Sequence, residues 1–177
     1  MIYVLIFSLC CLTARALYLP LDYSPAVGRG SGNSFASSGE DRITGVRVWE
    51  ISGSYIRGLQ LKYDYTWTPV FGQSLNEQQE MLLFDDEAIV QISGKYNPGN
   101  YVYQLMFVTN RGRFLIAGQP IGTSFNFYPN HRQGELRLIS GRSDSNGITS
   151  IAALWATAYP VAPNVPPSRN ESMLALS

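Results

Sequence analysis

Side chains that commonly carry catalysis or metal binding are few in this sequence. The histidine His131 lies in a polar turn between Asn130 and Arg132, whereas a Ser-His-Asp set needs an imidazole that is oriented and partly buried. We therefore expect His131 to be a surface residue. The acidic run Asp85–Glu87 is a poor calcium site, because calcium needs six or more oxygens from a spaced loop. We predict a solvated hairpin tip there, and we expect no enzymatic activity, metal or cofactor.

Three other stretches combine glycine with polar side chains and are candidates for ligand binding. They are Gly28–Asn33, Lys95–Tyr101 and Arg142–Gly147. Glycine permits positive φ and lets another group approach the backbone closely. The first stretch is not a phosphate loop, because no Gly-Lys-Ser/Thr closes it and no helix signal follows; a plain flexible turn explains it equally well. None of the three holds the pair of carboxylates that a glycosidase needs.

A tripeptide that occurs three times indicates how these stretches are positioned. Ile-Ser-Gly begins at residues 51, 92 and 139, which are 41 and 47 residues apart, within the range of repeat architectures. After a variable insert, each copy continues with one apolar residue and two more at three and five positions on. These apolar tails are Ile56, Leu59 and Leu61; Val102, Leu105 and Phe107; and Ile148, Ile151 and Ala153. The first insert is a two-residue tight turn, whereas the other two are long enough to display binding groups.

Most of the chain is predicted to be β-strand, because apolar and polar residues alternate with a period of two. The predicted strands are Leu17–Val27, Ile43–Glu50, Tyr55–Tyr63, Trp67–Phe71, Met81–Phe84, Ala88–Ile92, Tyr101–Thr109, Arg113–Ala117, Ser124–Tyr128, Glu135–Ile139 and a strand from Ile148. Leu17–Val27 is expected to be an edge, and Pro69 limits Trp67–Phe71 to an edge at best. Residues 148–155 also match helical spacing, but the repeat predicts a strand.

The length and the charge of the chain limit the classes of protein to which it can belong. The 177 residues fit one domain with a substantial apolar core. Thirteen basic and thirteen acidic residues balance, which argues against a nucleic-acid-binding protein. The Arg and Lys residues that recur on predicted strands are therefore expected to form a solvated sheet face.

The two ends of the chain differ from its middle. Residues 1–16 combine an apolar run with Ala-x-Ala at 14–16, which predicts a signal peptide and a secreted protein; the run is too short to span a bilayer. Both cysteines lie in it, so the mature domain, residues 17–160, is expected to fold without disulfides. Residues 161–177 are predicted to be a disordered, proline-rich tail with an N-glycosylation sequon at Asn170.

Five runs of sequence are shared, in order, with a known family. They are Ile43–Val48, Val90–Tyr96, Phe107–Phe114, Gly122–Asn126 and Leu138–Ser143. On these runs the chain resembles the jacalin-type lectins, which are carbohydrate-binding proteins, over about residues 28–160. The resemblance implies an all-β fold, the β-prism, with three four-stranded Greek-key sheets around a pseudo-threefold axis and one sheet for each repeat. It also implies that the three candidate stretches converge at one end of the prism and bind sugar there.

The resemblance implies a ligand of the mannose type or a related glycan. A carboxylate that accepts from two sugar hydroxyls, with backbone N–H groups donating to them, forms a charge-assisted set. A single sugar is expected to bind with a Kd of about 1 mM, so multivalent glycans would supply avidity. The implied carbohydrate-binding residues are Gly30, Ser31, Gly32, Asn33, Lys95, Tyr96, Asp144, Ser145, Asn146, Gly147 and Thr149.

The sequence departs from the family at two of these positions. Thr149 stands where the sugar-contacting loop normally has an aspartate, in a loop with one extra residue, and Asn33 stands where close relatives have a lysine. Threonine brings no charge, which would cost about 1–3 kcal/mol of binding. Asp144 or Asn146 could supply the missing acceptor from within the longer loop.

A second reading is a lectin fold that has lost its sugar site. Such a protein would bind a sulfated, polyanionic glycan or a protein partner through a basic face. Arg29, Lys95, Arg142 and Arg113 are the candidates for that face, and its binding would weaken with salt. Storage in secretory granules before secretion is implied by the family resemblance alone.

Overall fold

The structure is a computed structural model that describes residues 21–39 and 42–157, in which thirteen β-strands and no helix are present. These residues accordingly contain no helical segment that could cross a membrane. The predicted signal peptide, the proline-rich tail and the Asn170 sequon lie outside the described residues.

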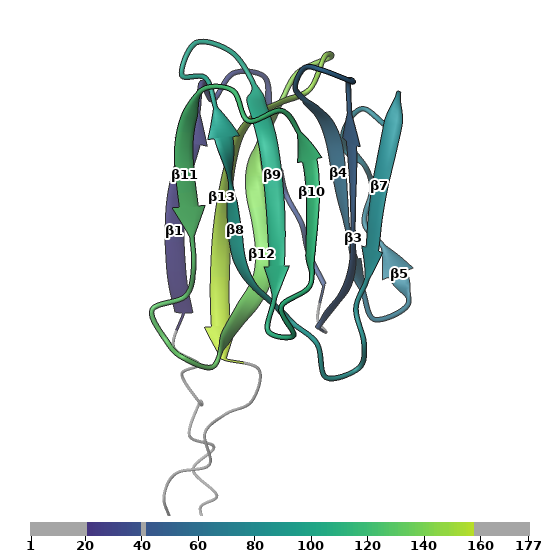
Figure 1. Cartoon of the computed structure of the whole chain (residues 1–177), viewed down its shortest axis with the longest axis vertical. Helices are drawn as coiled ribbons and strands as arrows, with labels where there is room; N and C mark the ends of the chain where they lie inside the picture. Colours follow the sequence, from purple (N-terminus) through teal and green to yellow (C-terminus); the bar gives the residue numbers. More distant parts are fainter. Residues whose placement is uncertain (1–20, 40–41, 158–177) are drawn as a thin grey trace, which may run out of the picture.

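The strands form three antiparallel sheets whose strands run along the long axis of the molecule (Figure 1). In spatial order, the first sheet contains β1 (Leu21–Gly28), β13 (Ile148–Thr157), β12 (Gly134–Ser143) and β2 (Asn33–Ala36). The second contains β10 (Phe114–Gly118), β9 (Val102–Thr109), β8 (Ile89–Tyr96) and β11 (Thr123–Phe127). The third contains β5 (Thr66–Trp67), β4 (Ile56–Tyr63), β3 (Ile43–Glu50) and β7 (Glu77–Leu82), with β6 (Phe71–Gly72) also paired to β4. The predicted three-sheet β-prism is confirmed.

The outer strand of the third sheet is broken where the sequence predicted an interrupted edge. Pro69 lies between β5 and β6, which pair separately with β4. Proline cannot donate a ladder hydrogen bond, so the break at this position has a local cause. The other predicted edge strand, before the glycine-rich stretch, is β1, and it lies at the edge of the first sheet.

The three apolar tails occupy equivalent positions and build the core. In each central hairpin a register shift is followed by one last pair: Glu50 with Ile56, Tyr96 with Val102, and Ser143 with Ile148. Counted from these last pairs, the nine tail residues occupy equivalent positions in the three hairpins, and all nine are fully buried. Strand β13 is confirmed over the stretch that also fitted a helix, because it is a central strand paired on both sides.

The Ile-Ser-Gly tripeptides occupy equivalent strand positions in only two of the three hairpins. The second and third copies lie inside β8 and β12, where Gly94 faces Phe125 of β11 and Gly141 faces Phe35 of β2. A Cβ on Gly94 would lie 2.8 Å from the Phe125 ring, and one on Gly141 would lie 3.0 Å from the Phe35 ring. Each glycine therefore makes room for an aromatic ring from the neighbouring strand.

The first Ile-Ser-Gly copy was wrongly aligned with the other two. Residues 51–53 form the turn after β3, in which the Ser54 N–H donates to the Ile51 carbonyl oxygen at 2.9 Å. The residue of β3 equivalent to Gly94 is Val48, and it pairs with Gln79 rather than with an aromatic residue. Val48 supplies its own buried side chain, so this sheet needs no glycine there.

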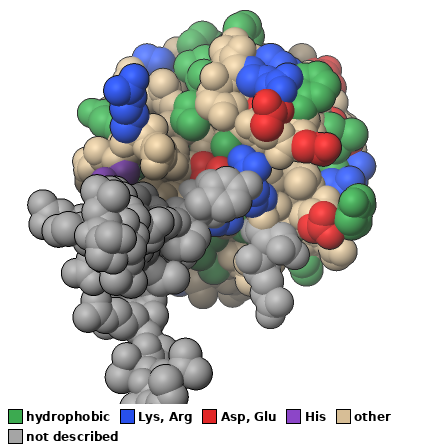
Figure 2. Space-filling model, turned by 90° about the horizontal axis from the view of Figure 1, so that it is seen from below, with side chains coloured by type: hydrophobic (Ala, Val, Ile, Leu, Met, Phe, Trp, Pro, Cys, Tyr) green, Lys and Arg blue, Asp and Glu red, His purple; other side chains and the backbone are tan. Residues whose placement is uncertain are grey.

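The acidic run is not the hairpin tip that we expected, although Asp85 and Asp86 are exposed as predicted. It joins β7 to β8, which belong to different sheets. The Glu87 side chain is 0% exposed, and its carboxylate accepts hydrogen bonds from the Thr109 hydroxyl (2.6 Å), the Arg113 guanidinium (2.6 Å) and the Phe84 N–H (3.0 Å). Figure 2 shows this lower end of the prism, where acidic and basic side chains lie next to one another. The run therefore anchors the connection between two sheets.

Glu87 makes the stability of the fold sensitive to acid. Burial by itself raises the pKa of its carboxyl, but the hydrogen bonds from Thr109 and Phe84 and the charge of Arg113 outweigh burial and hold the pKa below its ordinary value. A carboxyl whose pKa is lowered on folding stabilises the folded state above its unfolded pKa, and this contribution is lost as the pH falls through the folded value. Stability should therefore decline below about pH 4.

We expect Glu87→Gln to lower the free energy of unfolding by about 2 kcal/mol at pH 7, because a neutral amide makes weaker hydrogen bonds with Arg113 and Thr109. The difference from the parent should shrink as the pH falls below about 4, because the carboxyl of the unfolded chain then binds a proton more readily than that of the folded protein. Urea unfolding at pH 7 and pH 3.5 measures both effects. Glu77→Gln, at an exposed position of β7, is the matched control. An equal loss at both pH values would contradict the assignment.

Candidate functional site

The glycine-rich stretch between β1 and β2 lies against the hairpin of β12 and β13. Gly28, Gly30 and Gly32 have φ values of 109°, 73° and 87°, which L side chains rarely adopt. A Cβ on Gly28 would overlap the carbonyl oxygen of Thr149, and one on Gly32 would overlap that of Ser143. The predicted reasons for glycine, positive φ and close backbone approach, therefore both apply here.

Two polar contacts fix the glycine-rich stretch in this position. The Arg142 guanidinium donates from Nε (3.2 Å) and Nη2 (2.7 Å) to the Gly32 carbonyl oxygen. The Gly30 N–H donates to the Thr149 carbonyl oxygen at 3.3 Å. Two segments more than a hundred residues apart in the sequence thus form one surface.

The third insert is shorter than the sequence indicated. Arg142 and Ser143 belong to β12, which leaves the turn Asp144–Gly147. The Asp144 carboxylate accepts hydrogen bonds from the N–H groups of Asn146 (2.8 Å) and Gly147 (3.2 Å), so it holds the turn together. The side chains of Ser145 and Asn146 are exposed at the surface of the turn.

Thr149 does not present its hydroxyl to solvent. The residue is 0% exposed, and its hydroxyl donates to the Ser31 carbonyl oxygen at 2.5 Å, with the Arg142 carbonyl oxygen at 3.1 Å. This differs from the expectation that Thr149 accepts a hydrogen bond from a sugar. The threonine bridges the glycine-rich stretch to β12 and so shapes the surface without forming part of it.

Two residues expected in the second insert are strand residues instead. Lys95 and Tyr96 end β8, so their side chains alternate across the sheet. Lys95 donates from Nζ to the Ser124 hydroxyl of β11 at 2.7 Å, and the Tyr96 ring packs 6.2 Å from the Phe125 ring. Neither contacts the glycine-rich stretch or the Asp144–Gly147 turn among the interactions of the described residues.

The second hairpin reaches the third through Tyr101, the last residue of the second candidate stretch, which was not among the implied carbohydrate-binding residues. The Tyr101 hydroxyl donates to the Asp144 carboxylate at 3.3 Å. Its ring stacks on Tyr55 of the first hairpin, with centroids 4.2 Å apart and an interplanar angle of 19°. The three hairpin turns therefore meet, and Figure 1 shows them together at the upper end of the prism.

A sequence signal for these tyrosines was present in the repeat. Tyr55, Tyr101 and Gly147 each immediately precede the first residue of an apolar tail. Gly147 is required at the third of these positions, because a Cβ there would lie 2.5 Å from the Ile56 carbonyl oxygen and 3.0 Å from the Tyr55 ring. Two rings and one glycine thus fill the space between the hairpin turns, which a third ring would overfill.

The predicted basic face is only partly assembled. Arg29 and Arg142 are both exposed and both lie at the glycine-rich stretch or beside it. Arg113 lies at the far end of β9, where it pairs with Glu87, and seven residues of strand, about 23 Å, separate it from the hairpin turn. The prediction that Arg113 joins this face is therefore wrong.

Gly28–Asn33, Asn97–Tyr101 and Asp144–Gly147 form a surface, here called the loop end, at which polar groups of these three segments are displayed. A shallow cavity of about 360 Å³ opens beside it, lined by Gly28, Gly30, Ser34, Arg142 and Ser150 among others. The exposed side chains of Asn33, Ser145 and Asn146 offer amide and hydroxyl groups. No group of three or more metal-ligating side chains occurs in residues 21–39 and 42–157, and His131 is exposed as expected.

Comparison with known proteins gives one family. A model of the jacalin-like lectin domain matches residues 24–154. Zymogen granule membrane protein 16 from Rattus norvegicus is 41% identical over 141 residues, which cover 78% of this chain and 81% of the relative. The protein of the same name from Homo sapiens is 40% identical over a stretch of the same length.

Solved lectin structures share the fold. A prostate-specific WGA16 glycoprotein lectin superposes with a TM-score of 0.68 and 28% identity, covering 78% of this chain and all of that one. A mannose-binding lectin from champedak superposes with a TM-score of 0.65 at 24% identity, covering 76% of this chain and 96% of that one. The similarity to the WGA16 lectin supports carbohydrate binding. The similarity to the champedak lectin shows the fold alone.

Proposed function

Because this chain belongs to the jacalin-like lectin family, we propose that it is a secreted carbohydrate-binding protein whose ligand occupies the loop end. The observation that carries the proposal is the joining of the glycine-rich stretch to the β12–β13 hairpin, through Gly32 against Ser143 and through the Arg142 contact with the Gly32 carbonyl oxygen. This arrangement brings backbone groups and exposed amides to one surface, as recognition of adjacent sugar hydroxyls requires.

The ligand of this surface is a neutral glycan of the mannose type or a close relative. Its contacts come from the backbone of Gly30, Ser31 and Gly32 and from the side chains of Asn33, Ser145 and Asn146. Asp144 contributes indirectly, since two N–H groups of its own turn and the Tyr101 hydroxyl occupy its carboxylate. With at most one acceptor position left on the Asp144 carboxylate, the site holds a single sugar weakly, with a Kd of about 1 mM or above. Avidity for branched glycans supplies the useful affinity.

A sulfated glycan is the second candidate ligand. Arg29 and Arg142 favour it, because both are exposed beside the glycine-rich stretch and Arg29 has no ion-pair partner among the described residues. Two guanidinium groups form a small basic face compared with the stripe of charges that a long polyanion engages. A neutral glycan is therefore the first proposal.

The route of this protein is secretion through storage granules. The predicted signal peptide supports export. The name of the rat and human relatives places those proteins with zymogen granules, and a similar protein of this size is expected to follow the same route.

A glycan array at 50 mM and 200 mM salt, probed with the full chain lacking its signal peptide, tests the proposed function. We expect binding to mannose-type glycans that does not change with salt, and we expect Gly32→Ala to weaken it at least tenfold, because the added Cβ displaces the stretch from Ser143. Gly112→Ala is the matched control, since Gly112 has a similar φ of 74° and open space around its Cβ position. Binding restricted to sulfated glycans and lost at the higher salt would select the second candidate. Binding to neither class would reject the proposal.

A further inference from the structure

The three sheets of the prism meet along three seams, and single contacts bridge two of them. Phe35 of β2 stacks on Phe71 of β6 with centroids 4.7 Å apart. Between the second and third sheets, the Gly118 N–H donates to the Glu50 carboxylate at 2.5 Å. The third seam, between edge strands β1 and β11, holds a cavity of about 380 Å³, here called the β1–β11 groove.

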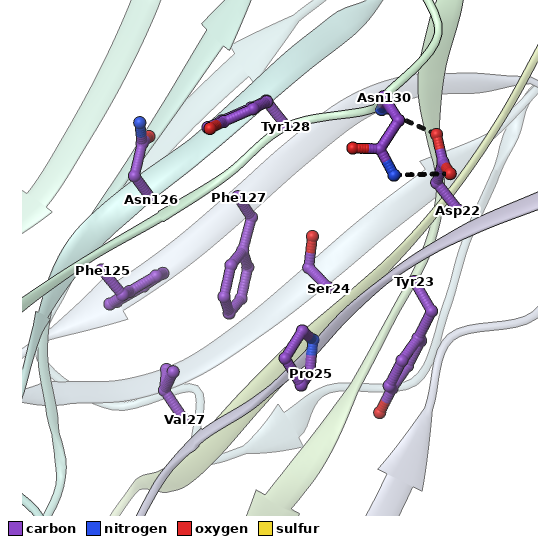
Figure 3. Close-up of a pocket in the computed structure, with 10 residues that line it drawn as sticks. All are labelled: Asp22, Tyr23, Ser24, Pro25, Val27, Phe125, Asn126, Phe127, Tyr128 and Asn130. Carbon is purple, nitrogen blue, oxygen red and sulfur yellow. Dashed lines mark hydrogen bonds between the residues drawn. The ribbon is translucent and has the colours of Figure 1, made fainter.

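The groove has an apolar floor and tyrosine walls (Figure 3). Its floor consists of Phe125 and Phe127, whose rings lie 4.8 Å apart, together with Val27. Tyr23 on the β1 side is 61% exposed and Tyr128 on the β11 side is 59% exposed. Exposed aromatic faces on both sides of a pocket bind ligands that themselves have a flat apolar face.

Polar groups lie along the rim of the groove. At one end the Asp22 carboxylate accepts hydrogen bonds from the Asn130 N–H (2.7 Å) and the Asn130 amide (2.9 Å), one at each oxygen. The Asn130 side-chain hydrogen bond holds the pKa of Asp22 below its ordinary value, and nearby His131 acts in the same direction, so the carboxylate is charged at neutral pH. A carboxylate has about four lone-pair positions, and Asn130 and the His131 backbone use three of them at Asp22, so one position remains for a ligand hydroxyl.

Further donors and acceptors face the same space. The hydroxyls of Tyr23 and Tyr128 have no hydrogen-bond partner within residues 21–39 and 42–157. Every second residue of an edge strand such as β11 also directs its N–H and C=O away from its paired neighbour.

We propose that the β1–β11 groove is a second carbohydrate-binding site, separate from the loop end, that holds one pyranose ring. A pyranose combines an apolar C–H face, which fits the tyrosines and the phenylalanine floor, with ring-edge hydroxyls that can donate to Asp22 and accept from the Tyr128 hydroxyl. A wholly apolar ligand would leave the Asp22 charge unpaired beside it. A polyamine would find a single carboxylate there, with His131 and Arg132 following Asn130 in the sequence.

Amide chemical shifts of the ¹⁵N-labelled full chain test this site separately from the loop end. The probes are methyl α-mannoside, methyl α-glucoside, methyl α-galactoside and N-acetylglucosamine, each added to about 100 mM because single-sugar affinity is weak. Asp22–Ser24 and Asn126–Asn130 report on the groove. Gly30–Asn33 and Asp144–Gly147 report on the loop end. We expect at least one of the four sugars to shift the groove amides in a saturable way.

Variants of the groove and of the loop end distinguish the two sites. Tyr128 lines the groove and not the cavity beside the loop end, which Tyr23 also borders. Tyr128→Ala should therefore weaken the groove shifts about tenfold and leave those of the loop end unchanged, whereas Gly32→Ala should do the reverse. Tyr65→Ala, at an 85% exposed position, is the control for loss of a surface tyrosine. The proposal is overturned if none of the four sugars shifts the groove amides, or if the shifts persist in Tyr128→Ala. Shifts caused by a proline-rich peptide and by no sugar would replace the carbohydrate with a peptide as the occupant.

Discussion

Thr149→Asp is expected to lower the free energy of unfolding by about 3–5 kcal/mol at pH 7, rather than to create a mannose site. The threonine hydroxyl donates toward the carbonyl oxygens of Ser31 and Arg142 in a position that is fully buried. An ionised carboxylate is an acceptor only, so it would face two further acceptors without solvent. The aspartate of related lectins stands in a loop one residue shorter, and a single exchange does not recreate that loop.

Chemical unfolding of Thr149→Asp at pH 7 and pH 4, beside a titration with methyl α-mannoside, checks this expectation. The loss of stability should be smaller at pH 4, because a protonated carboxyl regains one donor. Thr149→Ser keeps the hydroxyl and is the control; it should lose about 1 kcal/mol for the missing methyl group. A Thr149→Asp variant as stable as the parent and newly able to bind mannose would refute the bridging role of the threonine.

Gly141→Ala is expected to destabilise the fold by about 3 kcal/mol, and Gly94→Ala by a similar amount. In β12, a Cβ on Gly141 would overlap the Ser150 carbonyl oxygen of the paired strand and press on the Phe35 ring. The backbone oxygen cannot turn aside as a side chain can, so the two strands must separate or β2 must leave the sheet.

Thermal and urea unfolding of the single variants and of the double variant measure these effects. The two glycines lie in different sheets and share no contact among those at their Cβ positions, so the losses should add within about 0.5 kcal/mol. Gly99→Ala is the control, because its Cβ would make only an ordinary contact, 3.5 Å from the Asn97 side chain. A loss at Gly141 no larger than at Gly99 would show that the strands adapt to a side chain there.

Local sequence patterns were sufficient for the parts of the site that depend on backbone conformation. The glycine-rich stretch was singled out for positive φ and close approach, and Gly28, Gly30 and Gly32 show these features. The roles of side chains were less predictable. Lys95 was assigned to an insert, whereas it is the last but one residue of strand β8. The point at which pairing ends cannot be read from the sequence, and a shift of one residue moves a side chain to the other face of the sheet.

The remaining differences arise from partners distant in the sequence. Tyr101 reaches the site through Asp144, 43 residues on, and Thr149 is occupied by the carbonyl oxygen of Ser31, 118 residues away. Glu87 was read as a solvated acid because its neighbours in sequence are acidic, whereas Thr109 and Arg113 from the next hairpin enclose it. No pattern within one window of sequence contains these pairs.

The architecture could be predicted from local sequence patterns, because strand periodicity and the thrice-repeated apolar tail specify which residues must be buried together. Three such hairpins bury them only around a common core. The tertiary structure alone decided which polar groups remain free for a ligand. A hydroxyl or a carboxylate is available to a sugar only when no nearer donor or acceptor claims it. That competition is settled in part by residues distant in the sequence: Ser31 accepts from Thr149, and Tyr101 donates to Asp144.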